Sequence, residues 1–587
     1  MPPLLRVLLP RWLRRNWLLW LSLLMLALVW GPMIAAYPTT PTGDGERFLH
    51  QIEVGKAALR ARELPLWNPY DCLGIPLWDH PEALVVSPLL LALQPVNANL
   101  TSIVWQLAHA LAGFFGMWLL ARRDLRLGQI GAAFSATMWG FGATLTSQVA
   151  GAHFTFVSFW LMPWLIYLWR RAEHGLGAAV GLGAMLALIV YDGGTYPLPL
   201  GAVVLGLETL TRATPRRLPR IAVAALVTVA VMVGLSAARL LPLAEQFAIH
   251  KRHMEPDWDH LARAHTLKAM FLWPQWRWWP KLPGQQYVWG EYISFLGLPG
   301  LALAAVGLLV AIRRARWMWV VLIPCFWLML GGYDDDAPWA WLHERVFPFT
   351  AMRVPSRFRI FVFMILVLAG GLALDRVPRF LAHRFPRLRL LAALAIGALG
   401  SAALVTVVDT VILDQRVVAS RVGGKPLEAR TPAENLHYAL KDLANWPDQP
   451  RDNRAWLGCR QEFVFGWGAP LWPGDVPQAR SDRARVTNVK RTPSTFDFDV
   501  EVPEGSARVL LNSAYDVGWR SNVGTVREQR LLLVVDVGQG KQHVHVQYWP
   551  RRLTAGLVLT SCTALVLATW LVLGRVRRRR ALSSERR

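Results

Sequence analysis

Two acidic residues follow closely on the first membrane-length apolar run of the chain. The run ends at Ala36, and Asp44 and Glu46 lie in the short stretch from Gly43 to Arg47. A carboxylate at this position would stand at the mouth of the membrane, within reach of a lipid-borne substrate. Carboxylates can take up a proton during a reaction. The placement therefore favours a membrane enzyme over a channel or a soluble protein.

A second polar group, formed by Asp79, His80 and Glu82, follows on the same loop. One histidine and two carboxylates so close together could bind a metal, but Pro81 breaks the helical spacing. No further His or Cys set lies nearby in the sequence, so we predict no metal site. Contact with a substrate, or a role in the structure of the loop, is the better interpretation.

Two arginines, Arg353 and Arg357, precede a later apolar run on the outer side of the membrane. This position runs against the usual excess of basic residues on the cytoplasmic side. Their spacing would place both side chains on one helix face, with Pro355 near the helix start, where proline is tolerated. Because a guanidinium matches the geometry of a phosphate, we favour phosphate binding over simple anchoring to lipid headgroups.

The elements that must position these residues are membrane spans. Of the 587 residues, 54% are hydrophobic, and they recur in runs of roughly 17 to 22 residues, the length that crosses a bilayer. About twelve such runs place both termini in the cytoplasm and all arginine clusters but the outer pair on that side. The first run lacks a clear cleavage site, so we expect a retained anchor rather than a signal peptide. The net charge of +24 is therefore explained by basic residues in the cytoplasmic loops, and nucleic acid is not expected as a partner.

The long loops all lie on the outer side of the membrane in this topology. The cytoplasmic loops are short and basic, and they contain no nucleotide-binding fingerprint. Any chemistry is therefore expected on the extracytoplasmic side, in the segments 37–101, 240–292, 333–357 and 413–551.

The segment 413–551 is long enough to form a domain of its own. Several stretches alternate apolar and polar residues or are rich in branched apolar residues, which is typical of strands with one buried face. The predicted strands cover residues 495–502, 509–512, 531–537 and 542–548, with a turn at Gly538-Gln539-Gly540. We predict a β-sandwich-like domain docked on the membrane part.

The four cysteines of the chain exclude a disulfide framework and a cysteine-rich metal site. Cys325 and Cys562 fall within predicted spans, whereas Cys72 and Cys459 lie on the outer side. Only the outer pair could form a disulfide in an oxidising compartment. The sequence leaves open whether it does.

Short motifs occur in a characteristic order along nearly the whole chain. The first outer loop carries an Asp just past the first span, Pro-x-Trp-Asn-Pro-Tyr at 65–70, Gly-x-Pro at 74–76 and Ser-Pro-Leu at 87–89. Later motifs are Gly-Ala-His at 151–153, Leu-Leu-Pro at 240–242, Arg-Val-Pro-Ser-Arg at 353–357, Tyr-Asp-Val-Gly-Trp at 515–519 and Gln-Tyr-Trp-Pro at 547–550. In this order the chain resembles the YfhO-type bacterial membrane proteins of the GT-C glycosyltransferase superfamily. Family members often have Pro-Gly-Trp where this chain has Val517-Gly518-Trp519, so no catalytic role is assigned to that site.

The resemblance implies an inverting GT-C glycosyltransferase of the bacterial inner membrane. It would move a sugar from a polyprenyl-phosphate donor to a cell-envelope glycan or lipid outside the cytoplasm. This reaction needs a base for the acceptor hydroxyl and a cation for the leaving phosphate. Asp44 matches the first-loop Asp of the family and is the candidate base, although Asp is also a favoured helix cap. Arg353 and Arg357 would hold the phosphate.

His153 could hydrogen-bond a sugar or a phosphate in such a site, but an interfacial histidine satisfied by the backbone is an equally good interpretation. Asp79, His80 and Glu82 would contact the substrate. No cofactor is expected. The β domain would help to bind the acceptor.

The sequence thus predicts a polytopic α-helical membrane protein with about twelve transmembrane helices, GT-C-like, and an extracytoplasmic β domain before the last helix. The expected domains are 1–412, the membrane domain with the first outer loop 37–101; 413–551, the β domain; and 552–587, the last helix and a basic cytoplasmic tail. Two other functions stay open: a flippase or exporter of lipid-linked glycans, and a noncatalytic envelope-assembly protein. The lack of internal repeats and the scarcity of acidic residues in the spans speak against a transporter.

Overall fold

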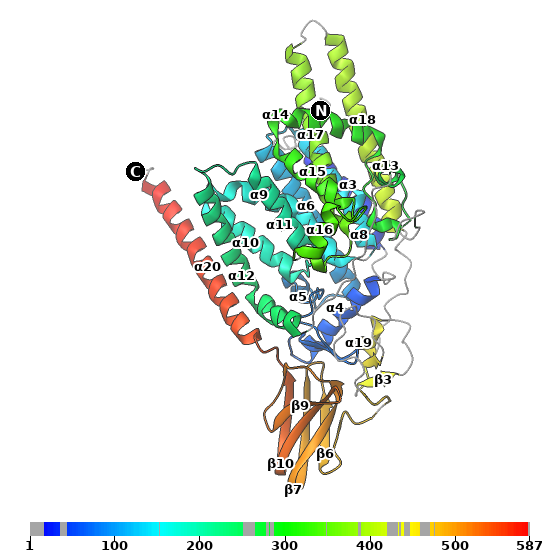
Figure 1. The fold of residues 1–587 in the computed structure, drawn as a ribbon, viewed down its shortest axis with the longest axis vertical. Coiled ribbons are helices and arrows are strands. Elements are labelled where there is room, and N and C mark those ends of the chain that lie inside the picture. The colour runs from blue at the N-terminus through cyan, green and yellow to red at the C-terminus, as the bar shows by residue number, and fades with distance from the viewer. Residues whose placement is uncertain are drawn as a thin grey trace.

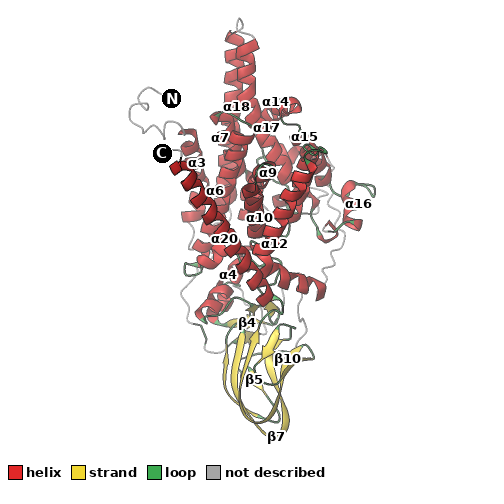
Figure 2. Ribbon diagram, turned by 90° about the vertical axis from the view of Figure 1, so that its left-hand side faces the viewer, coloured by secondary structure: helices red, strands yellow, loops and turns green. Residues whose placement is uncertain are grey.

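The molecule consists of a helical body and a sheet domain at one end of its long axis (Figure 1, Figure 2). The computed structural model describes residues 17–35, 44–151, 153–249, 264–277, 281, 287–347, 349–384, 389–419, 432–433, 436–439, 446–457, 470–474 and 476–584. In this part of the chain, 6 helices are long and apolar enough to cross a membrane, and shorter apolar helices accompany them. The chain is therefore a multi-pass membrane protein, whereas the predicted count of about twelve crossings is not confirmed.

The helical body is built from long helices and several shorter ones. The long helices are α6 (Ala98–Leu119), α12 (Leu218–Ile249), α14 (Gly297–Arg314), α17 (Arg359–Arg384), α18 (Arg389–Ala419) and α20 (Leu553–Ser584). The shorter helices are α3 (Trp17–Ala35), α7 (Gln129–Phe141), α8 (Ala143–Ala150), α9 (Met162–Ala172), α10 (Leu176–Tyr191), α11 (Pro197–Leu210) and α15 (Trp317–Met329). Helix α18 continues to Ala419, past residue 412, where the sequence predicted the last span of the body to end.

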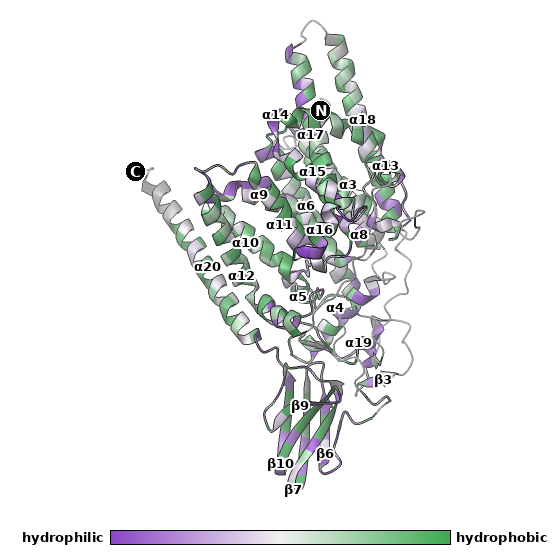
Figure 3. Ribbon diagram, viewed as in Figure 1, coloured by the Kyte–Doolittle hydropathy of each residue, from purple (hydrophilic) through white to green (hydrophobic). Residues whose placement is uncertain are grey.

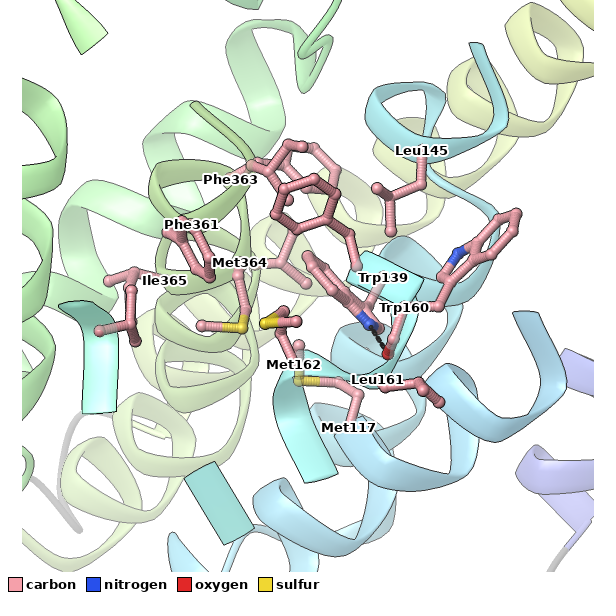
Figure 4. Close-up of a cluster of buried hydrophobic side chains, with 14 of the residues drawn as sticks. Met117, Trp139, Leu145, Trp160, Leu161, Met162, Phe361, Phe363, Met364 and Ile365 are labelled. Atoms are coloured by element: carbon pink, nitrogen blue, oxygen red, sulfur yellow. Dashed lines mark hydrogen bonds between the residues drawn. The ribbon is translucent and has the colours of Figure 1, made fainter. Parts of the chain in front are cut away.

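The core of the body surrounds α17, which is apolar on all sides and buried from Ile360 to Leu374 except at the partly buried Leu366. An all-round apolar helix is stable only when other helices cover it. Its neighbour α14 comes so close at Gly307 that a Cβ atom there would lie 1.7 Å from the carbonyl oxygen of Ala369. Figure 4 shows the packing beside it, where the Trp139 indole nitrogen donates to the carbonyl oxygen of Trp160 at 3.1 Å.

The outer faces of the helices are apolar as well, as the hydropathy colouring of the body shows (Figure 3). Helix α20 illustrates this, since Leu565 and Val566 are 67% and 66% exposed. Exposed apolar side chains on a helix of this length are expected where lipid replaces water as the solvent.

The sheet domain is formed mainly by two long strands that bend at the far tip of the molecule. Strand β7 (Thr495–Ala514) pairs antiparallel with β10 (Leu532–Tyr548) along nearly its whole length. Buried positions in β7 change from even to odd residue numbers across the exposed segment 503–506, so both halves bury side chains in one core. Strands β6 (Arg485–Arg491) and β8 (Trp519–Ser521) extend one half of the sheet, while β5 (Ala479–Arg480) and β9 (Thr525–Gln529) extend the other.

The first outer loop packs into the core of the sheet domain rather than standing apart from it. Its short hairpin, β1 (Trp67–Asn68) and β2 (Ile75–Pro76), turns at Gly74, where φ is +103° and a Cβ atom would lie 2.7 Å from the Trp67 ring. The Trp67 ring in turn packs on Trp519 and Tyr548 of the sheet domain, with ring centroids 5.2 and 4.7 Å away. Aromatic contacts of this kind stabilise a shared core beyond the area they bury.

A half-buried acid joins the same two regions. Glu63 accepts hydrogen bonds from the hydroxyls of Thr492 (2.6 Å) and Thr495 (3.0 Å) and from the amide of Ser494 (3.2 Å). The loop and the sheet domain therefore form one structural unit.

Candidate functional site

The polar side chains that gather at the outer helix ends centre on Arg357. Arg357 lies in the short turn η5 (Pro355–Phe358), directly before α17. Its Nη2 donates to Glu291 Oε1 at 3.0 Å, and its Nε donates to Glu291 Oε2 at 3.5 Å. Glu291 ends the turn η3 (Trp289–Glu291) of the preceding outer loop. Both side chains are buried, so they form a buried two-point ion pair.

Two aromatic rings lie against the same guanidinium. The Arg357 Cζ atom is 4.0 Å from the centre of the Tyr196 ring and 4.5 Å from that of the Phe156 ring. Tyr196 directly precedes α11, and Phe156 lies in η2 (Phe154–Leu161). Cation–π contacts stabilise a guanidinium whose solvent has been removed. The rings and the carboxylate together fix the orientation of Arg357.

His153 joins this group from the residue directly before η2. Its Nδ1 lies 3.0 Å from Gln148 Oε1 and 3.4 Å from Glu291 Oε1. Burial alone would raise the pKa of Glu291, but the charges of Arg357 and His153 outweigh it and hold that pKa at about 2. Glu291 is therefore ionised at neutral pH and cannot act as a general base.

Arg353 lies beside the group but is anchored differently from Arg357. Its amide donates to the Tyr196 hydroxyl at 3.4 Å, and its carbonyl oxygen accepts from the Tyr287 hydroxyl at 3.4 Å. The Arg353 Cζ atom is 5.7 Å from the centre of the Tyr287 ring. The expectation that both arginines share one helix face is wrong, because Arg353 precedes the turn η5 in irregular backbone.

Asp44 is the first residue of α4 (Asp44–Arg60), and its side chain lies outside the described part of the structure. Further along this helix, the Phe48 ring packs on the Phe154 ring with centroids 5.2 Å apart. Phe154 directly follows His153 in the chain. One helical turn, about 6 Å, separates Phe48 from Asp44. The start of α4 therefore lies beside the segment that carries His153.

Glu82 is attached to the same first turn of α4. Arg47 Nη2 donates to Glu82 Oε2 at 2.9 Å, and both side chains are mostly buried. The Glu82 amide donates to His80 Nδ1 at 3.1 Å. His80 is buried, so of the predicted group on this loop it is Glu82 that borders the start of α4.

Asp79 lies in a different environment, at the junction with the sheet domain. Its Oδ2 accepts from Gln246 Nε2 at 3.0 Å and from the Tyr548 hydroxyl at 3.4 Å, and Gln246 Nε2 lies 3.4 Å from Asp516 Oδ2 as well. Burial and the nearby charge of Asp516 raise the pKa of Asp79 to about 7. Asp79 is only 1% exposed. The hydrogen bonds of Asp79 therefore go to α12 and the sheet domain rather than to His153 or Arg357, with which the sequence had grouped it as a substrate contact.

Arg239 of α12 connects the loop segments that border the site. Its buried guanidinium donates to the carbonyl oxygens of Tyr191 (2.6 Å), His80 (3.2 Å) and Pro81 (3.2 Å). One carbonyl group at the end of α10 and two in the first loop are thereby held by one side chain. Arg239 was missed from the sequence because it lies inside an apolar run. An arginine at such a position is itself a signal, since charged residues in spans are rarely without a function.

Glu291 and Tyr196 were also missed. Glu291 stands at the end of a tryptophan-rich loop, in the turn η3. Glu291 and Arg357 are 66 residues apart in the chain, so the sequence gives no sign that the two side chains form an ion pair. One pattern in the sequence could have indicated the pair. An acid, Glu291, lies close to the start of one helix, and an arginine, Arg357, lies at the start of another.

The described residues contain no group of three His, Cys, Asp or Glu side chains placed to hold a metal ion. Cys72 is disulfide-bonded, and Cys325 and Cys562 are free. Cys459, the partner considered for Cys72, lies outside the described residues.

Comparisons with known proteins give likenesses in structure alone. No family model and no curated sequence matches the chain, whereas 9 chains of solved structures do. One is the arabinofuranosyltransferase AftD from Mycobacteria, with a TM-score of 0.45 and 17% identity over 69% of this chain and 27% of that one. A mutant of AftD gives 0.46 and 15% over 76% of this chain and 33% of that one.

A further similar structure is ArnT from Cupriavidus metallidurans bound to undecaprenyl phosphate. Its TM-score is 0.47, with 13% identity over 76% of this chain and 87% of that one. The chain matches most of the length of ArnT but spans only about a quarter of the length of AftD. At TM-scores below 0.5, these likenesses carry no weight for the activity of the chain.

Proposed function

We propose that the chain is an inverting glycosyltransferase of the GT-C type, as its ordered motifs imply. It transfers a sugar from a polyprenyl-phosphate donor to a cell-envelope glycan or lipid on the extracytoplasmic side of the bacterial inner membrane. One observation carries the proposal: Arg357 and His153, selected from sequence, lie in one polar cluster beside the start of the helix that begins with Asp44. The candidate roles follow from the chemistry that each group can perform.

Arg357 holds the leaving phosphate. A guanidinium has five N–H donors in a planar fork, and Glu291 accepts from two of its nitrogens. The remaining donors stay available to phosphate oxygens in an orientation that Glu291, Tyr196 and Phe156 fix in advance. Preorganised donors stabilise charge as it develops, at no cost of reorientation during the reaction.

Asp44 is the general base. The acceptor hydroxyl attacks the anomeric carbon of the donor sugar, a new C–O bond forms, and the bond from that carbon to the phosphate oxygen breaks. The phosphate leaves as an anion and needs no proton, whereas the acceptor proton passes to the Asp44 carboxylate. Glu291 cannot replace Asp44, because its low pKa keeps it from holding a proton at neutral pH.

His153 and Arg353 supply further contacts to the phosphate or the sugar, and Glu82 borders the site through Arg47. Asp79 and His80 support the loop from within, since both are buried. The sheet domain, which shares a core with the first outer loop, holds that loop in place and contributes to acceptor binding. No cofactor takes part in the proposed reaction.

The experiment is a transfer assay with purified protein and a lipid-linked donor. The Asp44→Asn variant keeps the size of the side chain and removes the base, so transfer should fall at least about 100-fold. The Glu46→Gln variant is the matched control, because it removes a carboxylate from the same helical turn and should transfer at close to the wild-type rate. Transfer by Asp44→Asn at the wild-type rate would show that the base is assigned wrongly.

A further inference from the structure

Helix α18 exposes one face along most of its length. Leu394, Leu404, Val408 and Ile412 are 61%, 66%, 44% and 44% exposed. The opposite face, with Thr406, Thr410 and Asp414, is buried against the body. Such an apolar face is ordinary where lipid covers it. This face, however, also carries two charged residues.

Asp409 and Arg416 are both exposed on the outward side of α18. They are seven residues apart, two turns of a helix, so they share a face. In the described part of the chain, neither side chain has a hydrogen-bond or ion-pair partner. Arg416 is near the end of the helix, where a long side chain can reach the interface. Asp409 has a short side chain and no such route.

The depth of Asp409 follows from the neighbouring helix. Gln415 Nε2 donates to the carbonyl oxygen of Leu28 at 3.0 Å, so α18 and α3 pack side by side. Both helices run toward the sheet domain (Figure 1). Six residues back along α18, about 9 Å, Asp409 is level with Ser22 of α3. Ser22 begins the apolar segment 22–32, so a bilayer that covers this segment would place Asp409 against hydrocarbon rather than water.

A carboxylate facing lipid at this depth is unfavourable, and acidic residues in spans almost always face protein and pair with another group. We propose that this face of α18 is an interface for a transmembrane helix of a partner protein, which presents a lysine or arginine to Asp409. Arg416 marks the same interface two turns closer to the sheet domain, where an acidic residue of the partner would complement it. The inference does not rest on the proposed function.

Charge complementarity decides between a partner protein and a second copy. Two copies related by a two-fold axis would contact each other through the same patch. Asp409 would then face Asp409 across a low-dielectric interface, and like charges repel strongly there. A partner helix with a basic residue avoids this repulsion, because the basic residue and Asp409 neutralise each other.

The test uses the full chain in membranes of the cells that naturally produce it. A photoreactive side chain at position 405, on the exposed face, is cross-linked in the membrane, and the attached peptide is sequenced by mass spectrometry. The same membranes are extracted in mild detergent, and the size of the complex is measured for wild type, Asp409→Asn, Asp409→Lys and the control Val408→Ala. The basic residue found in the cross-linked peptide is then changed to Glu and combined with Asp409→Lys.

We expect a cross-link to a transmembrane segment of another protein that contains a lysine or arginine. Asp409→Asn should reduce the fraction of chain in the complex at least about ten-fold, because a desolvated charge would lose its partner. Val408→Ala should leave the complex intact, and the charge exchange should restore it in Asp409→Lys. A chain that runs as a single copy, a cross-link only to α18 of a second copy or to lipid, or an Asp409→Asn complex of wild-type size would each overturn the proposal.

Discussion

Glu291 and Asp79 are both buried carboxylates in loops between the helices, yet their surroundings shift their pKa values in opposite directions. Glu291 faces Arg357 and His153, which hold its pKa at about 2. Asp79 faces Asp516, and burial together with that charge raises its pKa to about 7. The two residues have similarly low exposure, 4% and 1%. What surrounds a buried acid therefore decides its chemistry more than burial itself does.

The two acids have different partners, although the sequence had assigned the residues around them to one site. The cluster around Arg357 contains cations held in fixed orientation, which suits an anionic ligand such as a phosphate. The junction around Asp79 contains two acids bridged by Gln246 and Tyr548, which suits a structural contact between the loop, α12 and the sheet domain. In the proposed reaction, the cluster around Arg357 binds the phosphate, and the junction around Asp79 holds the first loop in place.

The largest effect is expected from Arg357→Met. This change leaves Glu291 buried without its cation, which should lower the free energy of unfolding by roughly 3 to 5 kcal/mol. Thermal unfolding in detergent micelles measures this loss. The matched control is Arg345→Met, because Arg345 pairs with Glu344 at 2.9 Å on the exposed surface. An exposed pair contributes only about 0 to 1 kcal/mol, so equal losses in both variants would contradict the assignment of Arg357.

The next effect concerns Asp79 and depends on pH. Because the folded-state pKa is about 7, above the unfolded value of about 3.9, the stabilisation is complete below the unfolded pKa and is lost as pH rises through about 7. Asp79→Asn should remove this dependence and make the protein more stable than wild type at pH 8, by at most about 4 kcal/mol. Unfolding midpoints measured from pH 5 to pH 8 check this. Parallel curves for the two proteins would mean that Asp79 does not titrate in this range.

His153→Ala should have a smaller effect, confined to donor binding. Loss of one hydrogen-bonding group near the phosphate would weaken donor binding about ten-fold, or roughly 1.4 kcal/mol. Initial rates at varied donor concentration should show a higher KM with little change in the unfolding midpoint. If the midpoint falls and KM does not change, His153 has only a structural role.

The smallest effect is expected from Glu63→Gln, at the contact between the first loop and the sheet domain. The amide can still accept hydrogen bonds from Thr492 and Thr495, but it loses the strength of a charged acceptor, about 1 kcal/mol. Limited proteolysis should cut between the loop and the sheet domain somewhat faster than in wild type. An unchanged cleavage rate together with unchanged unfolding would show that the shared aromatic core alone holds the junction.

Much of the sheet domain could be predicted from sequence. Alternating residues at 495–502 and 542–548 predicted strands, and β7 and β10 confirm them. The sequence predicted four separate strands, whereas the structure joins them in pairs. The reason is that exposed residues at 503–506 and 538–540 bend each strand without ending it. Periodicity detects a buried face but not whether pairing continues through a bend.

The site was accessible to sequence reasoning only in part. Arg357 stood out because an arginine on the outer side runs against the usual charge distribution, and His153 stood out through the Gly-Ala-His motif of the family resemblance. Their partner Glu291 did not, because an ion pair between distant segments leaves no local pattern. The different partners of Asp79 and Glu82 could not be predicted either. Asp79 contacts α12 and the sheet domain, whereas Glu82 pairs with Arg47 of α4, and only the fold brings these segments together.

In the proposed reaction, the cluster around Arg357 binds the phosphate of a lipid-linked donor. The most direct measurement is the affinity of the purified chain in nanodiscs for undecaprenyl phosphate, used as the polyprenyl-phosphate probe, for wild type, Arg357→Gln and Asp79→Asn. We predict that wild type and Asp79→Asn bind with dissociation constants within about two-fold of each other, and that folded Arg357→Gln binds at least about ten-fold more weakly, because it loses a charged donor. Equal binding by wild type and Arg357→Gln, or a loss only in Asp79→Asn, would contradict the account.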